Sequence, residues 1–292
     1  MIKMSNKKRK HVLAVVLMMI AFVFISPLIL TMTGSFMASD EITEKYYEFS
    51  ETDNSIPEMI GYFFLRFVPN KITLSNYNVV LVETQQFLKM FWNSVFLVVP
   101  IVLGQVLISS MAAFVFAKVQ FRGREVIFFS YIIIMMMPFQ VTLVPNYFTL
   151  NWLNLLDTRA AIILPGIFSA FGVFLLRQFM MSIPNDYIES AKIDGANLFT
   201  IFFKIVFPIT KGGIASLAIL GFIDNWNMVE QPLIFLDDIS KHPLSIYLSS
   251  VSESEIGVLF TAGFIYLLPL IIMFLYGENY LVEGVSNSTT KG

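Results

Sequence analysis

Five side chains with hydroxyl-binding or ring-stacking chemistry interrupt the apolar stretch 212–236. They are Asp224, Trp226, Asn227, Glu230 and Gln231. In a continuous helix, Asp224, Asn227 and Gln231 recur at i, i+3 and i+7 and share one face, with Glu230 within about 100° of it. Carboxylates and amides bond hydroxyl groups, and an indole ring stacks on the face of a sugar. The set therefore predicts a pathway for a polyhydroxylated solute.

The same polar residues also fit a structural role, as a helix–helix hydrogen bond. An acidic residue costs about 2.5–3.5 kcal/mol at the centre of a membrane helix, so such residues usually face a cavity or one another. Glu230 lies near one end of the stretch, where it would reach water. Both interpretations stay open from the residues alone.

The sequence contains no set of residues that would make this chain an enzyme. It has two histidines, His11 and His242, and no cysteine. Both histidines are expected to be solvated, and no cluster of metal ligands accompanies them. No phosphate-binding G-x-x-x-x-G-K-[ST] run is present, so the chain is expected to bind neither ATP nor another cofactor.

Six apolar runs are long enough to cross a bilayer, which takes about 20 residues. They cover residues 12–33, 93–117, 126–150, 160–176, 212–236 and 256–276. The chain is 56% hydrophobic and 14% charged, against roughly 25% charged in soluble domains. Continuous apolar runs favour helices over barrel strands, which alternate. The prediction is an all-α polytopic membrane protein, with Pro138 and Pro145 kinking the third run.

The distribution of charge predicts the orientation of these helices, because lysine and arginine gather on the cytoplasmic side. Most of the 19 basic residues fall in the N-terminus, in the loops after the second and fourth runs and in the tail, which places both termini in the cytoplasm. We expect a first segment 1–33 with a retained rather than cleaved helix, an extracytoplasmic loop 34–92 with an acidic part over 39–68, and a core 93–292.

A polar run between the fourth and fifth helices reads Glu189-Ser190-Ala191, three residues, Gly195, nine residues, then Ile205-x-Phe207-Pro208. Pro184 suits the first turn of a helix, and Gly195 suits its C-terminal end. A second helix is expected over Leu198 to Phe207, stopping at Pro208, with its phenylalanines at 199, 202, 203 and 207 on one packed face. The pattern predicts a cytoplasmic hairpin that serves as a handle for another protein.

This run resembles the coupling loop of ATP-binding-cassette importer permeases, whose pattern is E-A-A, three residues, G, nine residues, I-x-L-P. Ser190 stands at the second position and Phe207 replaces leucine, while the glycine and both spacings match. The resemblance implies a six-helix permease of the type I importer class, with loop 182–211 docked on an ATPase subunit. The implied docking residues are Glu189, Ser190, Ala191, Asp194, Gly195 and Ala196.

Further motifs over residues 73–292 are similar to those of carbohydrate importers of the maltose-transporter type. They are T-L-x-N-Y at 73–77, N-S at 93–94, F-G-V-F-L-L-R-Q-F at 171–179, W-N at 226–227 with P-L at 232–233, and the terminal Lys291-Gly292. From the residues alone, the first two also fit an ordinary turn and a helix cap.

The resemblance implies a multi-pass subunit of the bacterial inner membrane that imports a sugar or oligosaccharide. Its implied partners are an ATPase dimer that binds ATP and Mg²⁺, a second homologous permease, and an extracytoplasmic solute-binding protein. The alternatives are a permease for a non-sugar solute, or a stand-alone secondary transporter with inverted repeats.

Overall fold

The protein is helical throughout the part that the structure describes. A computed structural model describes residues 6–46, 68–250 and 255–289, and within them extended pairing is limited to a bridge between Met37 and Ile72. The all-α prediction is confirmed. Most of the predicted acidic insertion 39–68 and the terminal Lys291-Gly292 lie outside the described residues.

The chain packs into two compact units. The first contains Met1–Leu88 and Leu248–Leu267, and the second contains Lys89–Tyr247 and Leu268–Gly292. The predicted division at residues 33 and 92 concerns the sides of the membrane and stays a prediction, as does the cytoplasmic location of both termini.

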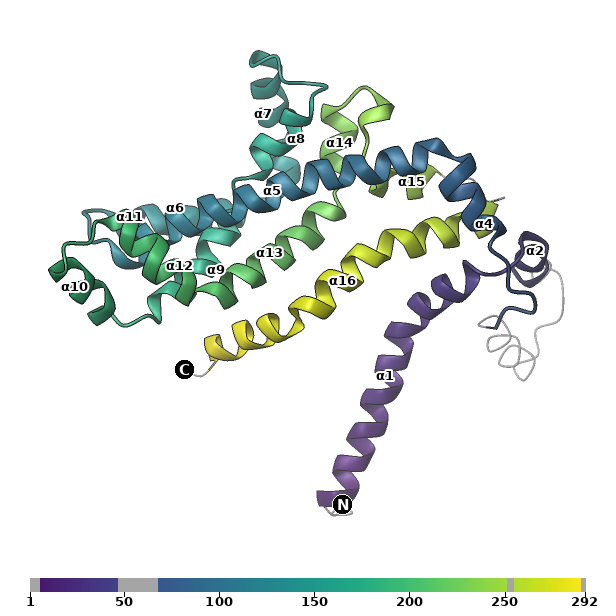
Figure 1. Cartoon of the computed structure of the whole chain (residues 1–292), viewed down its shortest axis with the longest axis horizontal. Helices are drawn as coiled ribbons and strands as arrows, with labels where there is room; N and C mark the ends of the chain where they lie inside the picture. Colours follow the sequence, from purple (N-terminus) through teal and green to yellow (C-terminus); the bar gives the residue numbers. More distant parts are fainter. Residues whose placement is uncertain (1–5, 47–67, 251–254, 290–292) are drawn as a thin grey trace. The chain divides into compact units, whose positions relative to one another are not determined.

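Polar contacts hold the first unit together around the end of its first long helix, which is drawn in purple in Figure 1. Its helices are α1 (Asn6–Gly34), α2 (Ser39–Tyr46), α4 (Ser75–Asn78), the π turn η2 (Val79–Glu83) and the beginning of α16 (Ile256–Thr289). The carboxylate of Glu41 is buried and accepts the backbone N–H groups of Asn70 and Lys71 at 2.6 and 3.1 Å. These bonds satisfy an acid that would otherwise be costly to bury.

The T-L-x-N-Y segment, residues 73–77, forms hydrogen bonds to other segments of this unit as well as turning the chain. The buried Asn76 side chain donates to the carbonyl of Met37 at 2.8 Å, and the Tyr77 hydroxyl lies 2.8 Å from Ser35 Oγ. A Cβ atom at Gly257 would lie 2.8 Å from the Asn76 side chain. The segment therefore joins α1, α4 and α16 through close contacts.

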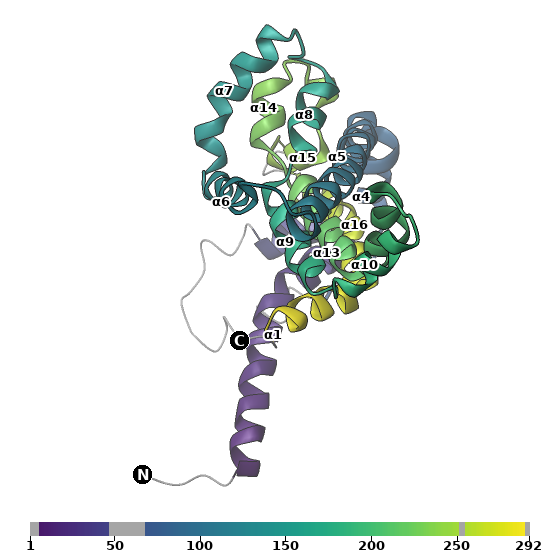
Figure 2. The ribbon, with the colours of Figure 1, turned by 90° about the vertical axis from the view of Figure 1, so that its left-hand side faces the viewer.

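The second unit is built from long and short helices (Figure 2). Its elements are α5 (Gln85–Lys118), α6 (Arg124–Met135), α7 (Phe139–Trp152), α8 (Arg159–Gly166), α9 (Ala170–Met181), α10 (Asp186–Ile193), α11 (Leu198–Ile201), η3 (Phe202–Val206), α12 (Phe207–Ile209), α13 (Lys211–Trp226), α14 (Glu230–Phe235), η4 (Ile239–Lys241), α15 (Leu244–Ser250) and the end of α16. In Figure 2, α14 lies beside α7 and α8.

Close packing of α5 against α8 and α13 depends on a buried glutamine. Gln105 donates from Nε2 to the carbonyl of Gly166 at 2.8 Å, and a Cβ atom at Gly221 would lie 2.5 Å from its Oε1 atom. Small residues allow membrane helices to approach this closely.

Four helical segments are long and apolar enough to cross a membrane, and the number rises to six if two bent pairs each count as one span. The four segments are Lys10–Gly34, Gln85–Lys118, Ile256–Glu278 and Arg159–Met181, of which the last consists of α8 and α9. The bent pairs are α6 with α7, at 100°, and Leu198–Ile209 with α13, at 77°. Pro138 lies at the first bend and begins α7 as its N-cap, where its missing N–H group costs little.

The prediction of one continuous helix over 212–236 is wrong, because α13 ends at Trp226 and α14 begins at Glu230. Proline at 232 has no N–H group to donate to the carbonyl of Met228, four residues earlier. The hydroxyl of Ser245, from α15, donates to that carbonyl instead. The break is thus stabilised by a side chain distant in the sequence.

Candidate functional site: an exposed hairpin and a broken helix pair

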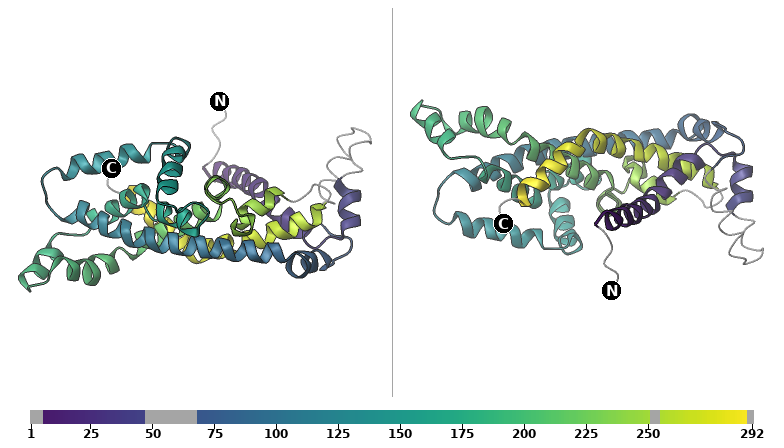
Figure 3. Two further views of the ribbon diagram at one scale, coloured as in Figure 1. Left: turned by 90° about the horizontal axis from the view of Figure 1, so that it is seen from above. Right: turned by 90° about the horizontal axis from the view of Figure 1, so that it is seen from below.

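The hairpin over residues 183–209 forms one end of the second unit (green in Figure 3). Its first helix, α10, ends in a Schellman motif, in which Ala196 N–H donates to Ala191 O at 2.9 Å and Gly195 N–H to Lys192 O at 3.0 Å. Gly195 has φ of +81°, a left-handed conformation that glycine adopts without a Cβ penalty. The predicted helix end at Gly195 is confirmed.

The second helix of the hairpin begins where predicted and ends later than predicted. Its first residue is Leu198, after the N-cap Asn197, whose side chain accepts the Thr200 N–H at 2.8 Å. The helix widens into the π turn η3 and continues through Pro208 to Ile209 instead of stopping at Pro208. Pro208 lies at the beginning of α12, where a missing N–H group is tolerated.

Buried apolar residues fix the hairpin to α5, α9 and α13. Ile188 from α10 and Ile201, Phe202 and Val206 from the second helix are at most 4% exposed and pack with Phe114, Leu176 and Leu217. Each such side chain contributes about 1.5–3 kcal/mol relative to exposure. The hairpin is therefore rigidly attached to the long helices.

The expected face of four phenylalanines is wrong for two of them. Phe202 is buried and Phe207 packs partly, but Phe199 is 67% exposed and Phe203 is 49% exposed. A π turn repeats at i+5, so Ile201 and Val206 share the buried face that the regular helical spacing assigns to the phenylalanines.

The residues predicted to dock a partner divide between the surface and the core. Glu189, Ser190, Asp194 and Gly195 are exposed, whereas Ala191 and Ala196 are half-buried against the hairpin's core. Sequence reasoning missed Ile193, which is 87% exposed directly before the turn. The sequence signal for it was an isoleucine in a polar run, two residues before the turn glycine.

A groove of about 670 Å³ separates α10 from the end of α5. Lys118, Arg124 and Lys192 line it together with Glu189. Lys118 donates from Nζ to the carbonyl of Ile183 at 2.5 Å and to Asn185 Oδ1 at 3.0 Å. Glu189 therefore shares this groove with three of the chain's own cations.

The five predicted pathway residues do not form one helical face, because the helix breaks among them. Asp224 and Asn227 are exposed at the end of α13, while Glu230 and Gln231 belong to α14. Trp226 is 1% exposed, with its ring stacked on Phe222 at 5.3 Å and edge-on to Phe91 at 5.8 Å. The expectation that Trp226 offers a stacking surface is therefore wrong for this conformation.

Glu230 has a partner that sequence reasoning missed. Gln140, in the first turn of α7, donates from Nε2 to both carboxylate oxygens of Glu230, at 3.1 and 3.2 Å. Both side chains are exposed. The sequence signal for it was a glutamine two residues after Pro138 in a largely apolar run.

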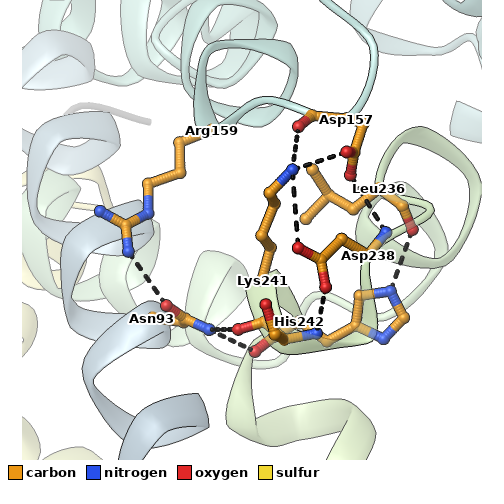
Figure 4. A network of polar contacts seen from close by, with 8 residues as sticks. Asn93, Asp157, Arg159, Leu236, Asp238, Lys241 and His242 are labelled. Atoms are coloured by element: carbon orange, nitrogen blue, oxygen red, sulfur yellow. Dashed lines mark hydrogen bonds and ion pairs between the residues drawn. The ribbon is translucent and has the colours of Figure 1, made fainter.

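A polar network joins the loop between α7 and α8 to the loop after α14 (Figure 4). Lys241 Nζ donates to the Asp157 carbonyl at 2.7 Å and to Asp157 Oδ2 at 2.6 Å, and Asp157 Oδ1 accepts Asp238 N–H at 3.1 Å. The hydrogen bond from Lys241 lowers the pKa of the Asp157 carboxyl, and the same bond raises the pKa of Lys241. Asp157 has φ of +57°, so the network maintains an uncommon backbone conformation.

Asn93 and His242 complete this network, and both differ from expectation. Asn93 lies inside α5 rather than at its cap, and donates to the carbonyls of Ser240 and His242 at 2.8 and 3.1 Å. His242 is buried, with Nε2 3.0 Å from the carbonyl of Leu236, so the expectation of a solvated histidine is wrong. Arg159 donates to Asn93 Oδ1 at 3.1 Å.

Comparison with curated proteins finds relatives over almost the whole chain. The arabinooligosaccharide transport permease AraQ of Halalkalibacterium halodurans is 30% identical over 276 residues, covering 94% of this chain and 93% of the relative. AraQ of Bacillus subtilis is 30% identical over 278 residues, with the same coverage. The sn-glycerol-3-phosphate permease UgpE of Escherichia coli K12 is 30% identical over 207 residues, covering 69% of this chain and 74% of the relative.

A solved structure shares the fold. It belongs to a bacterial ABC transporter involved in the import of the acidic polysaccharide alginate, with a TM-score of 0.79 and 24% identity over 96% of this chain and 99% of that one. The family described as binding-protein-dependent transport system inner membrane component matches residues 105–281. That match includes the hairpin, both helices of the broken pair and most of the long helices. The chain belongs to this family of inner membrane transport permeases.

Proposed function

We propose that this permease imports a sugar or oligosaccharide at the expense of ATP that a partner hydrolyses. The observation that carries the proposal is the hairpin: an exposed, small-residue turn on a base packed rigidly to α5, α9 and α13. Such a base transmits force from a docked partner to the long helices. The AraQ relatives are named for transport of arabinooligosaccharides, which supports a carbohydrate as cargo.

The docking surface on this proposal comprises Glu189, Ser190, Asp194 and Gly195, with Ala191 and Ala196 packing behind them. The exposed Ile193 and Tyr187, at 87% and 56%, add apolar area. The partner is an ATPase dimer that holds ATP and Mg²⁺, because this chain carries no phosphate-binding loop. A second homologous permease and an extracytoplasmic solute-binding protein complete the assembly.

The cargo pathway on this proposal passes Asp224, Asn227, Glu230 and Gln231 at the break between α13 and α14. Trp226 packs against Phe222 and Phe91 beside that break and does not contact the cargo, because its ring is buried. Broken helices line substrate sites in other transporters because their unpaired backbone and polar side chains need a cavity or a partner.

Purification from the native membrane in mild detergent tests the proposal. We expect an ATP-binding-cassette ATPase and a second six-span permease to co-purify with the chain, and the Gly195→Asp variant to lose the ATPase. A chain that purifies alone or as a homo-oligomer would overturn the ATP-driven function and favour a secondary transporter.

A further inference from the structure

The groove between α10 and the end of α5 lies where four apolar segments begin or end. Lys118 is the last residue of α5, and Met181 is the last residue of the segment made of α8 and α9. Arg124 and Leu198 are the first residues of the two bent pairs. All four side chains line the groove. Because apolar membrane segments end at the boundary with water, this puts the groove at the depth of the lipid headgroups.

One face of α10 forms a wall of this groove. Asn185, Ile188, Glu189 and Lys192 line it and recur at i, i+3, i+4 and i+7, the spacing of one helical face. Ile193, the most exposed apolar residue of α10, does not line the groove. The helix therefore offers one face to the groove and another to a docked partner.

The groove has an excess of positive charge. Lys118, Arg124 and Lys192 line it together with one carboxylate, that of Glu189. Among the residues that the structure describes, neither Lys192 nor Glu189 has an ion-pair partner within 4.0 Å. Gln120 adds amide N–H donors to the lining. The groove therefore attracts an anion, and the carboxylate weakens this attraction without cancelling it.

Two of the cations keep donors available after their contacts within the chain. Lys118 has three N–H groups, of which the Ile183 carbonyl and Asn185 Oδ1 accept two. Arg124 contacts Glu125 through Nε at 3.0 Å and through Nη2 at 2.9 Å, which leaves N–H groups on both terminal nitrogens. A guanidinium beside ammonium groups is the donor set that binds phosphate oxygens.

Apolar side chains line the rest of the groove. Met181 and Leu198 are 51% and 47% exposed, and Phe114 is buried behind them in the same lining. A free phosphate ion has no apolar part that would cover these side chains. The glycerol backbone and first acyl carbons of a phospholipid would cover them, and burial of apolar area is favourable.

We propose that this groove binds the headgroup of an anionic phospholipid. The phosphate contacts Lys118, Arg124 and Lys192. The glycerol backbone and the first acyl carbons lie along Met181 and Leu198. Basic pockets between membrane helices bind anionic headgroups in this way. The inference depends on the groove and on membership of a membrane permease family, and it does not depend on the cargo.

Native mass spectrometry tests this inference on the full chain, purified from its native membrane in mild detergent with any partners that co-purify. The probes are dioleoylphosphatidylglycerol, zwitterionic dioleoylphosphatidylcholine, and glycerophosphoglycerol, the soluble headgroup without acyl chains. We expect phosphatidylglycerol to bind at least about tenfold more tightly than either of the other probes. Equal affinity for the two lipids, or for the soluble headgroup and phosphatidylglycerol, would overturn the inference.

Lys192→Gln assigns the binding to the groove. The side chain is exposed, so we expect the variant to fold, with thermal unfolding like that of the parent. Its affinity for phosphatidylglycerol should fall about fivefold, which corresponds to about 1 kcal/mol for one basic residue near an anionic lipid surface. Lys204→Gln is the matched control, on an exposed lysine of the same hairpin that does not line the groove. Glu189→Gln removes the opposing charge and should strengthen binding.

Equal loss of affinity in Lys192→Gln and Lys204→Gln would contradict binding in the groove. Loss of the ATPase from Lys192→Gln with unchanged lipid affinity would assign the groove to an acidic segment of that partner, and would also overturn the inference. A chain that purifies without an ATPase and still binds phosphatidylglycerol as expected would overturn the proposed function alone.

Discussion

Lys118, the last residue of α5, donates from Nζ to the backbone carbonyl of Ile183 at 2.5 Å. The same ammonium reaches Asn185 Oδ1, directly before α10, at 3.0 Å. One side chain therefore joins a long helix that is apolar enough to span a membrane to the entry of the proposed docking helix. A force applied to α10 would pass to α5 through this bond as well as through the apolar base.

Lys118→Met should loosen that connection while keeping the length and packing of the side chain. Hydrogen bonds to a charged group contribute about 1.5–3 kcal/mol, and partial exposure reduces this to about 1 kcal/mol here. We expect a lower ratio of solute imported to ATP hydrolysed in the reconstituted transporter. Lys211→Met, on an exposed lysine at the start of α13, is the control, and an equal effect of both variants would contradict a specific role for Lys118.

Gly195→Asp should abolish transport without preventing insertion into the membrane. A side chain at φ of +81° costs about 1 kcal/mol in backbone strain, too little to unfold the protein, and no atom lies within 4 Å of the added Cβ. The expected loss comes from placing a charged side chain on the docking surface. Uptake and ATPase co-purification would be measured together.

Gly123 offers a matched control, because it has φ of +88° and equally open space around its Cβ position. Gly123→Asp carries the same strain but lies in the α5–α6 connection, outside the hairpin. Comparable loss of transport in both variants would attribute the effect to strain rather than to docking.

Asp224→Ala distinguishes a pathway residue from a structural one. The side chain is exposed and makes no bond to another described residue, so its removal should leave the yield of the complex unchanged and its free energy of unfolding within about 0.5 kcal/mol of the parent's. We expect slower cargo uptake and weaker stimulation of ATP hydrolysis. Asp237→Ala, on an exposed loop aspartate, serves as control, and a change confined to complex yield would make Asp224 structural.

The sequence predicted features whose causes are local. The sequence predicts Gly195 at a helix end because a left-handed residue is needed there, and the Schellman bonds follow from the same geometry. The ring of Trp226 is buried against Phe222 and Phe91. The amide of Gln140 donates to Glu230, which is 90 residues away in the sequence. Periodicity along one segment contains no information about such contacts.

One break was within reach of sequence reasoning and was missed. Pro232 lies inside the predicted span and lacks the N–H group that Met228 would need in a continuous helix. The rule that predicts a kink at Pro138 also predicts an interruption of this span before Pro232. The identity of Ser245 as the replacement donor required the tertiary structure.

The Asp157–Lys241 pair predicts how the two loops in Figure 4 respond to pH. The pKa of Asp157 is lowered, chiefly by the hydrogen bond from Lys241, so its contribution is complete above the unfolded value of about 3.9. That contribution is lost as pH falls through the lower folded value. The pKa of Lys241 is raised, chiefly by Asp157, so its contribution is complete below about 10.4 and is lost as pH rises through the higher folded value.

Hydrogen exchange of the two backbone amides in the network measures this directly. Asp157 N–H donates to Phe235 O at 2.8 Å, and Asp238 N–H donates to Asp157 Oδ1 at 3.1 Å. After correction for intrinsic rates, we expect constant protection between about pH 5 and 9 and a decline below about pH 4, where Asp157 gains a proton. Lys241→Met should lower protection across the whole range, whereas Lys89→Met, on an exposed lysine of α5, should not. Protection in Lys241→Met equal to that of the parent would mean that Asn93 and His242 alone hold these loops together.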